Sequence, residues 1–225
     1  MLAILTLGFF IGLKHAMEAD HLAAVATIAS RHSRPRDIIR HGLTWGLGHA
    51  LTLGALGGAA FLLGSAIPER LANGLEFAVG IMLVALGAQV LWRLWKERTH
   101  VHVHEHGGER HLHVHSHGAR RADGHDHEHG FRWRTLLVGF MHGMAGSAAL
   151  LLLAMTQVRD PVRGLVYIAV FGVGSMVGMG ILSAVIAVPL TLSARFLTFA
   201  NNGLQGLIGV STVGLGVMAM VEHWG

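Results

Sequence analysis

Long apolar stretches separated by short polar segments dominate this 225-residue chain. Six of the stretches reach the length of about 20 residues that a helix needs to cross roughly 30 Å of hydrocarbon. The pattern therefore predicts an all-α polytopic membrane protein with six transmembrane helices, embedded in a lipid bilayer. We place these helices at residues 2–29, 41–64, 74–96, 133–156, 163–190 and 198–221.

Short glycine motifs recur between the two halves of the chain. Residues 12–17 and 139–144 share the pattern Gly-x-x-His-x-Met, residues 46–49 and 172–175 share Gly-x-Gly, and a pair of glycines seven residues apart recurs in the third and sixth stretches. Three spans per half would insert the second half upside down, as in the inverted repeats of secondary transporters. We therefore expect a three-helix repeat at 1–96, a loop at 97–132 and a second three-helix repeat at 133–225.

Basic residues gather between alternate spans. Four arginines follow the first span, and eight Arg or Lys residues flank or occupy the third loop, whereas the opposite side has three. The positive-inside rule then places the first, third and fifth loops in the cytoplasm and both termini outside, in what we expect to be a bacterial inner membrane. Because the basic residues occupy these loops and not one face, the pI of about 10.6 does not indicate a nucleic-acid partner.

The first span contains ionisable residues where lipid is expected, in the sequence G-L-K-H-A-M-E-A-D-H at 12–21. An ionisable side chain at the bilayer centre costs roughly 2.5–3.5 kcal/mol and indicates function. On an unbroken helix His15, Glu18 and His21 would lie within an arc of about 120°, with Asp20 pointing elsewhere. Either the helix is unwound here or Asp20 supports a ligand from behind it. The alternative is a helix end at the interface, with a lysine that reaches water.

Two further histidines lie beside glycines in the second and fourth spans. Each alone would more often be a packing residue, but both occupy repeat motifs. Imidazole and carboxylate without any cysteine suit Ni²⁺, Co²⁺ or Zn²⁺ better than Ca²⁺ or Mg²⁺, and methionines in the same spans leave Cu⁺ open. The candidate metal ligands are His15, Glu18, Asp20, His21, His49 and His142.

The third loop is dense in histidine. Its alternation with valine resembles a strand, but glycine, arginine and acidic residues interrupt it, so we expect the loop to be disordered. Such a segment would buffer transition-metal ions weakly at many sites, the alternative being a solvated or proton-responsive linker. The loop ligands would be His100, His102, His104, His106, His111, His113, His115, His117, His125, His127 and His129.

Residues 15–21, H-A-M-E-A-D-H, resemble the H-x-x-x-x-D-H signature of the nickel/cobalt transporter family. Residues 47–50, L-G-H-A, are similar to that family's L-G-H-S element. The resemblance implies a polytopic metal permease whose motif histidines and aspartate recognise the ion. It thus implies recognition roles for His15, Asp20, His21 and His49.

The chain departs from that family's pattern in two respects. The familiar permeases have eight spans with an extra N-terminal helix, and an acidic G-F-D-T-A-T-E element where this chain reads G-F-M-H-G-M-A at 139–145. The chain is in this respect similar to the short six-helix branch associated with urease accessory genes. Its His-rich loop also resembles that of nickel/cobalt efflux proteins, so the resemblance leaves uptake and efflux open.

We therefore expect a secondary transporter, not an enzyme, that moves Ni²⁺ or Co²⁺, with Zn²⁺ also compatible, and has no prosthetic group. Protons compete with metal for imidazole and carboxylate, which makes them the candidate coupling ion. The chain contains no G-x-x-x-x-G-K-[ST] motif for ATP. Two alternatives are an intramembrane hydrolase in which bound Zn²⁺ activates water, and a metal sensor or donor acting through the His-rich loop.

Overall fold

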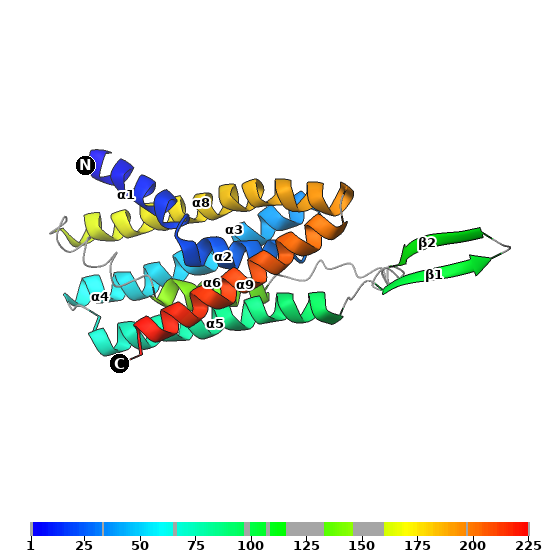
Figure 1. The fold of residues 1–225 in the computed structure, drawn as a ribbon. Helices are drawn as coiled ribbons and strands as arrows, with labels where there is room; N and C mark the ends of the chain where they lie inside the picture. The colour runs from blue at the N-terminus through cyan, green and yellow to red at the C-terminus, as the bar shows by residue number, and fades with distance from the viewer. Residues whose placement is uncertain are drawn as a thin grey trace.

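The computed structural model is an elongated bundle of helices with a small hairpin at one end (Figure 1). It describes residues 2–32, 34–64, 67–96, 100–106, 109–115, 133–145, 160–196 and 198–224. The helices are α1 (Leu2–His15), α2 (Ala19–Ala29), α3 (Pro35–Thr52), the π-helical turn η1 (Leu53–Gly57), α4 (Gly58–Leu63), α5 (Glu69–Lys96), α6 (Trp133–Ala145), α8 (Pro161–Phe196) and α9 (Thr198–Glu222).

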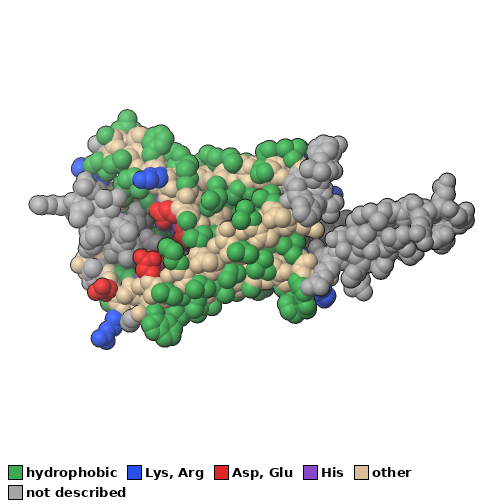
Figure 2. All heavy atoms as spheres, viewed as in Figure 1, with side chains coloured by type: hydrophobic (Ala, Val, Ile, Leu, Met, Phe, Trp, Pro, Cys, Tyr) green, Lys and Arg blue, Asp and Glu red, His purple; other side chains and the backbone are tan. Residues whose placement is uncertain are grey.

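Four stretches of the described residues are helical, long and apolar enough to cross a membrane: Pro35–Leu63, Glu69–Lys96, Val162–Leu192 and Asn201–Glu222. The pair α1 and α2, bent by 58°, is a fifth candidate. Apolar side chains cover much of the outer surface of the bundle (Figure 2), as expected where the solvent is lipid. The chain is thus an integral membrane protein.

The expectation of six spans holds only in part. The second, third, fifth and sixth predicted spans each correspond to one long helical stretch, and the first is a broken span. The fourth, expected at 133–156, is helical over Trp133–Ala145 as α6, and its remainder lies outside the described residues.

The break in the first span lies at residues 16–18. The amide of Met17 donates to the Lys14 carbonyl at 2.9 Å and that of Glu18 to the His15 carbonyl at 3.1 Å, so α1 ends in a tight turn. Glu18 then adopts an extended conformation, with ψ of 151°, and α2 begins in a new direction. In the first turn of α2 the Asp20 carboxylate accepts a hydrogen bond from the His21 amide at 2.8 Å, which satisfies one of the amides that a helix start leaves without a partner.

Glycines let the helices approach to backbone contact. A methyl group on Gly12 of α1 would overlap the Phe171 carbonyl oxygen of α8. A methyl group on Gly139 of α6 would overlap the Trp45 carbonyl oxygen of α3. Close packing of small residues is the usual basis of helix association in lipid, where the hydrophobic effect does not drive it.

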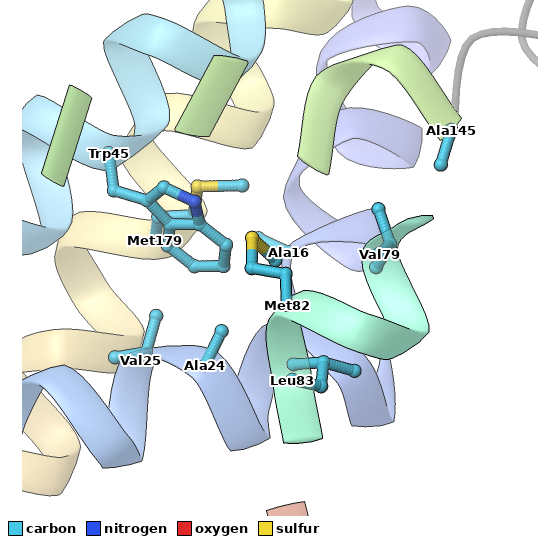
Figure 3. Close-up of a cluster of buried hydrophobic side chains, with 9 residues drawn as sticks. All are labelled: Ala16, Ala24, Val25, Trp45, Val79, Met82, Leu83, Ala145 and Met179. Carbon is cyan, nitrogen blue, oxygen red and sulfur yellow. The ribbon is translucent and has the colours of Figure 1, made fainter. Parts of the chain in front are cut away.

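A buried apolar cluster joins five of these elements (Figure 3). Three alanines within it keep the backbones close, while a tryptophan and two methionines fill the space between helices. The cluster fixes α2 against α3 and α5, next to the break in the first span. Its members are Ala16, Ala24, Val25, Trp45, Val79, Met82, Leu83, Ala145 and Met179.

Part of the His-rich loop differs from the disordered tract that we expected. Strands β1 (His100–His106) and β2 (Glu109–His115) pair as an antiparallel hairpin in which His100 faces His115 and His106 faces Glu109. The two-residue alternation of histidine with apolar residues is the pattern of a strand, and here it outweighs the interruptions. The rest of 97–132 lies outside the described residues.

Candidate metal centre

The break in the first span brings histidines from four helices together. His15 ends α1, His21 lies in the first turn of α2, His49 lies in the last turn of α3, and His142 lies in the last turn of α6. The His21 ring centroid is 4.5 Å from that of His15, 5.0 Å from that of His49 and 4.2 Å from that of His142. We call these four residues the imidazole cluster.

Asp20 holds two members of the imidazole cluster. Its Oδ1 lies 3.0 Å from His21 Nδ1, and its Oδ2 lies 2.8 Å from His142 Nε2. A carboxylate accepts hydrogen bonds, so both facing ring nitrogens carry protons and the opposite nitrogens carry lone pairs. The structure therefore combines the two arrangements considered from the sequence: the helix is broken, and Asp20 supports histidines from behind.

Glu18 supports His15 in a similar way. Its Oε1 lies 3.0 Å from His15 Nδ1, which directs the Nε2 lone pair away from Glu18. The Glu18 side chain is 57% exposed and the Asp20 side chain 35% exposed, whereas the four histidines are nearly or fully buried. The two carboxylates thus lie on the more exposed side of the imidazole cluster.

The imidazole cluster contains buried nitrogen atoms without a hydrogen-bond partner in the described part of the chain. They are His15 Nε2, His21 Nε2, both ring nitrogens of His49 and His142 Nδ1. Each unpaired buried polar group costs about 1–3 kcal/mol, so several in one place are unfavourable unless a ligand binds them. The cluster has the chemistry of a cation site.

Two overlapping groups have the spacing for a metal ion. His15, His21 and His49 each offer a nitrogen, and these atoms lie within 4.8 Å of one another; so do ligand atoms of Asp20, His21 and His142. Metal–nitrogen bonds of about 2.0–2.1 Å would draw the first group closer by small ring rotations. The first group is the better candidate because its nitrogens lack other partners, whereas Asp20 already binds two rings.

Two aromatic residues that the sequence did not single out line the imidazole cluster. The Trp45 ring centroid is 5.5 Å from that of His21 and 5.3 Å from that of His142, and the Phe171 ring lies 5.5 Å from His15. The signal in the sequence was position: Trp45 precedes His49 by one helical turn, and each aromatic directly precedes a Gly-x-Gly motif. These rings exclude water and fix the histidine rings.

The other residues considered from the sequence are not members of the imidazole cluster. Lys14 and Met17 are exposed beside the break and bind no part of the imidazole cluster that the described residues include. For the loop histidines that lie in β1 and β2, only the backbone is described. The others, His117, His125, His127 and His129, lie outside the described residues.

Comparison with known proteins supports the assignment to a membrane family. Residues 3–218 match the family described as the transmembrane region of cytochrome c biogenesis proteins. The chain is 38% identical over 213 residues to the urease accessory protein UreH of Bacillus sp. (strain TB-90), an alignment that spans 95% of this chain and 89% of that protein. No solved structure matches the chain. The family match covers nearly the whole chain, and the structure is a helical bundle. The chain therefore belongs to the cytochrome c biogenesis transmembrane-region family and is a membrane relative of UreH.

Proposed function

We propose that the protein transports a divalent transition-metal ion, Ni²⁺ or Co²⁺, across the bacterial inner membrane. The ion would be held by His15, His21 and His49, with Asp20 and Glu18 orienting the rings. The observation that carries the proposal is the set of buried, unpartnered imidazole nitrogens at a broken helix inside an apolar bundle. Broken helices at mid-membrane are where secondary transporters bind their ions.

The ligand chemistry selects a group of ions, and the relative's name then favours nickel within that group. Neutral imidazole without thiolate suits Ni²⁺, Co²⁺ and Zn²⁺. A relative that is 38% identical is named a urease accessory protein, and nickel is the metal that urease requires. A protein of this kind would supply nickel for enzyme maturation, with no catalytic step of its own.

We further propose that the fold consists of two inverted three-helix repeats. The glycine contacts support this because they are reciprocal: Gly12 meets the Phe171 carbonyl of α8, and its counterpart Gly139 meets the Trp45 carbonyl of α3. The contacts between α5 and α9 follow the same rule, since Gly80 meets Gly216 and Gly87 meets Gly209. Exchanging the halves converts each of these glycine contacts into another member of the set.

The two halves would contribute unequally to the ion. His15, His21 and His49 all come from the first half, whereas the second contributes His142, and the counterpart of His49 is Ser175. The Oγ of Ser175 is buried and has no partner in the described residues. In this account the first half binds the ion, and rocking of the second half against it exposes the ion to one side and then the other.

Protons are the coupling ion in this proposal. A metal ion binds only deprotonated imidazole, so protons and metal compete for the same nitrogens. Loss of the ion to one compartment would let the histidines take up protons there. An imposed pH gradient would then drive metal accumulation without ATP.

The test is accumulation of radioactive Ni²⁺ by cells that express single-residue variants at equal membrane levels. His21→Ala and His49→Ala should reduce accumulation, or resistance if the direction is outward, to the level of cells without the protein. His223→Ala is the matched control, because the His223 ring has a hydrogen-bond partner, the Ala219 carbonyl at 2.9 Å, and is not a member of the imidazole cluster. Wild-type transport by both cluster variants would overturn the proposal.

A second candidate function, metal donation through the His-rich loop, is favoured by the accessory role in the relative's name. Deleting residues 100–129 separates the two. A transporter keeps most of its flux without the loop, whereas a donor loses its effect on a nickel enzyme while keeping metal bound at the imidazole cluster.

A further inference from the structure

A polar face of α2 leads away from the imidazole cluster. Asp20 and Thr27 are seven residues apart, two turns and about 10 Å along the helix, and so lie on the same face. Thr27 is fully buried, and its Oγ1 lies 3.1 Å from Oγ1 of Thr212, also fully buried, on α9. Thr212 further lies within hydrogen-bonding distance of the Ala23 carbonyl, at 3.4 Å. We call this line of contact between α2 and α9 the polar seam.

Arg93 lies in the last turn of α5, at the end of the bundle that we call the loop end, where α5 ends (Figure 1). Its Nη2 donates to the Ser30 carbonyl at the end of α2 and to Gln205 Oε1 on α9, both at 2.9 Å. One side chain of α5 thus ties together the two helices that form the seam. Next to it, Arg31 donates to Gln89 of α5.

The charged groups at the loop end would repel a cation. Burial and then the positive charge of Arg93 lower the pKa of Arg31, so the two guanidinium groups are near neighbours. They donate to the Ser30 carbonyl and to the amide oxygens of Gln89 and Gln205, none of which carries a negative charge. Two positive groups across a narrow polar seam would repel a divalent metal ion.

The other end of the bundle has the opposite character. The exposed carboxylate of Glu18 and the partly buried one of Asp20 lie beside the imidazole cluster, and acidic side chains are visible over the half of the bundle that holds both termini (Figure 2). The seam residues Thr27, Ser30 and Thr212 are buried. Among the described residues, the polar groups beside the cluster are therefore more exposed toward the terminal end than toward the loop end.

We propose that the polar seam between α2 and α9 is the loop-end half of the ion path, and that Arg93 is the residue that closes it. This inference rests on the proposed transport function. When Arg93 leaves Ser30 and Gln205, α2 and α9 separate, and the threonine hydroxyls become the next oxygen ligands of the ion after the imidazole cluster. In the plain structural alternative, Arg93 only caps α2 and the threonine pair only packs two helices together.

Cysteine accessibility separates the two interpretations. The chain has no cysteine, so Thr212→Cys and Ala19→Cys each introduce a single reporter, one in the buried seam and one at the exposed start of α2. Each reporter is combined with Arg93→Gln, which removes the charge, or with Gln205→Glu, which gives Arg93 an ion-pair partner. Arg163→Gln is the control, because that side chain is 62% exposed and lies near Asp160 at the other end. Labelling uses a membrane-impermeant maleimide applied from either side of membrane vesicles.

Arg93→Gln should raise the labelling rate of the Thr212→Cys reporter at least tenfold, from the loop side only, and lower that of the Ala19→Cys reporter. Gln205→Glu should do the reverse, and Arg163→Gln should change neither. Unchanged labelling of the seam reporter in Arg93→Gln would overturn the proposal, as would a rise at both reporters, because that pattern means local unfolding. The readout needs no metal, so it can fail while Ni²⁺ flux stands, and it can succeed while Ni²⁺ flux fails.

Discussion

Replacing Asp20 with asparagine tests how the imidazole cluster is prepared for a metal. Asparagine has the shape of aspartate, but it offers one acceptor oxygen and one donor amide where the carboxylate offers two acceptors. Asp20 now binds His21 Nδ1 at 3.0 Å and His142 Nε2 at 2.8 Å. In Asp20→Asn one of these rings must turn its lone pair toward the new amide group. That ring then carries its proton on the other nitrogen, which faces the cluster.

The expected decrease in Ni²⁺ affinity follows from the loss of this hydrogen-bond acceptor. Removing a hydrogen-bond partner behind a metal ligand costs about 10- to 100-fold in metal affinity, or about 1.4–2.7 kcal/mol. Asp20 orients one ligand ring, His21, and also holds the neighbouring His142 ring, so we expect a loss within that range. Glu18→Gln should cost less than about tenfold, because Glu18 is 57% exposed and supports one ring.

The assay is calorimetric titration of Ni²⁺ into purified protein in lipid nanodiscs, with both variants and the wild type at the same pH. X-ray absorption of the loaded proteins should show the same number of imidazole ligands in the wild type and in Asp20→Asn. An Asp20→Asn affinity within twofold of the wild type would refute the orienting role. Loss of an oxygen ligand from the metal shell would instead make Asp20 a direct ligand.

Three further predictions follow from the packing and the loop. Gly139→Ala should lower the free energy of unfolding by about 1–3 kcal/mol, because the added methyl group overlaps the Trp45 carbonyl. Gly74→Ala is the control and should not lower it, because a methyl group there meets no atom within 4 Å. Thermal unfolding in detergent measures both variants. His49→Ala should leave the Tm of metal-free protein nearly unchanged, since losing two unpaired nitrogens offsets the cavity, yet it should abolish the Ni²⁺-induced rise in Tm. An unchanged Ni²⁺-induced rise would contradict this assignment. Deleting 100–129 should preserve at least about half of the Ni²⁺ flux through liposomes, and complete loss would contradict the view that transport does not need the loop.

The sequence predicted much of the candidate site because the free-energy cost of an ionisable side chain in lipid can be recognised from the residues around it in the sequence. A cluster of charges between apolar residues is unfavourable wherever it occurs in a span, so 12–21 was conspicuous without knowledge of its neighbours. Helical geometry then required a break or a supporting aspartate, and the structure has both. His49 and His142 followed from glycines that permit close approach.

The parts that the sequence did not predict depend on distant pairs. Arg93 and Gln205 are 112 residues apart in the chain, and periodicity carries no information on which helices become neighbours. The aromatic lining by Trp45 and Phe171 was missed for the same reason. In the His-rich loop, two local signals conflicted, and the alternation with valine proved stronger than the glycines and charges over β1 and β2. The close α5 and α9 pairing was visible only as matching glycine spacings.

The most direct test of the central claim is Ni²⁺ movement by the purified protein in sealed liposomes under an imposed pH gradient. The account predicts Ni²⁺ accumulation that collapses with the gradient, competes with Co²⁺ and is absent from the His21→Ala protein. Accumulation that is equal in His21→Ala and wild type, or no flux in either although the wild type binds Ni²⁺, would contradict transport through the imidazole cluster.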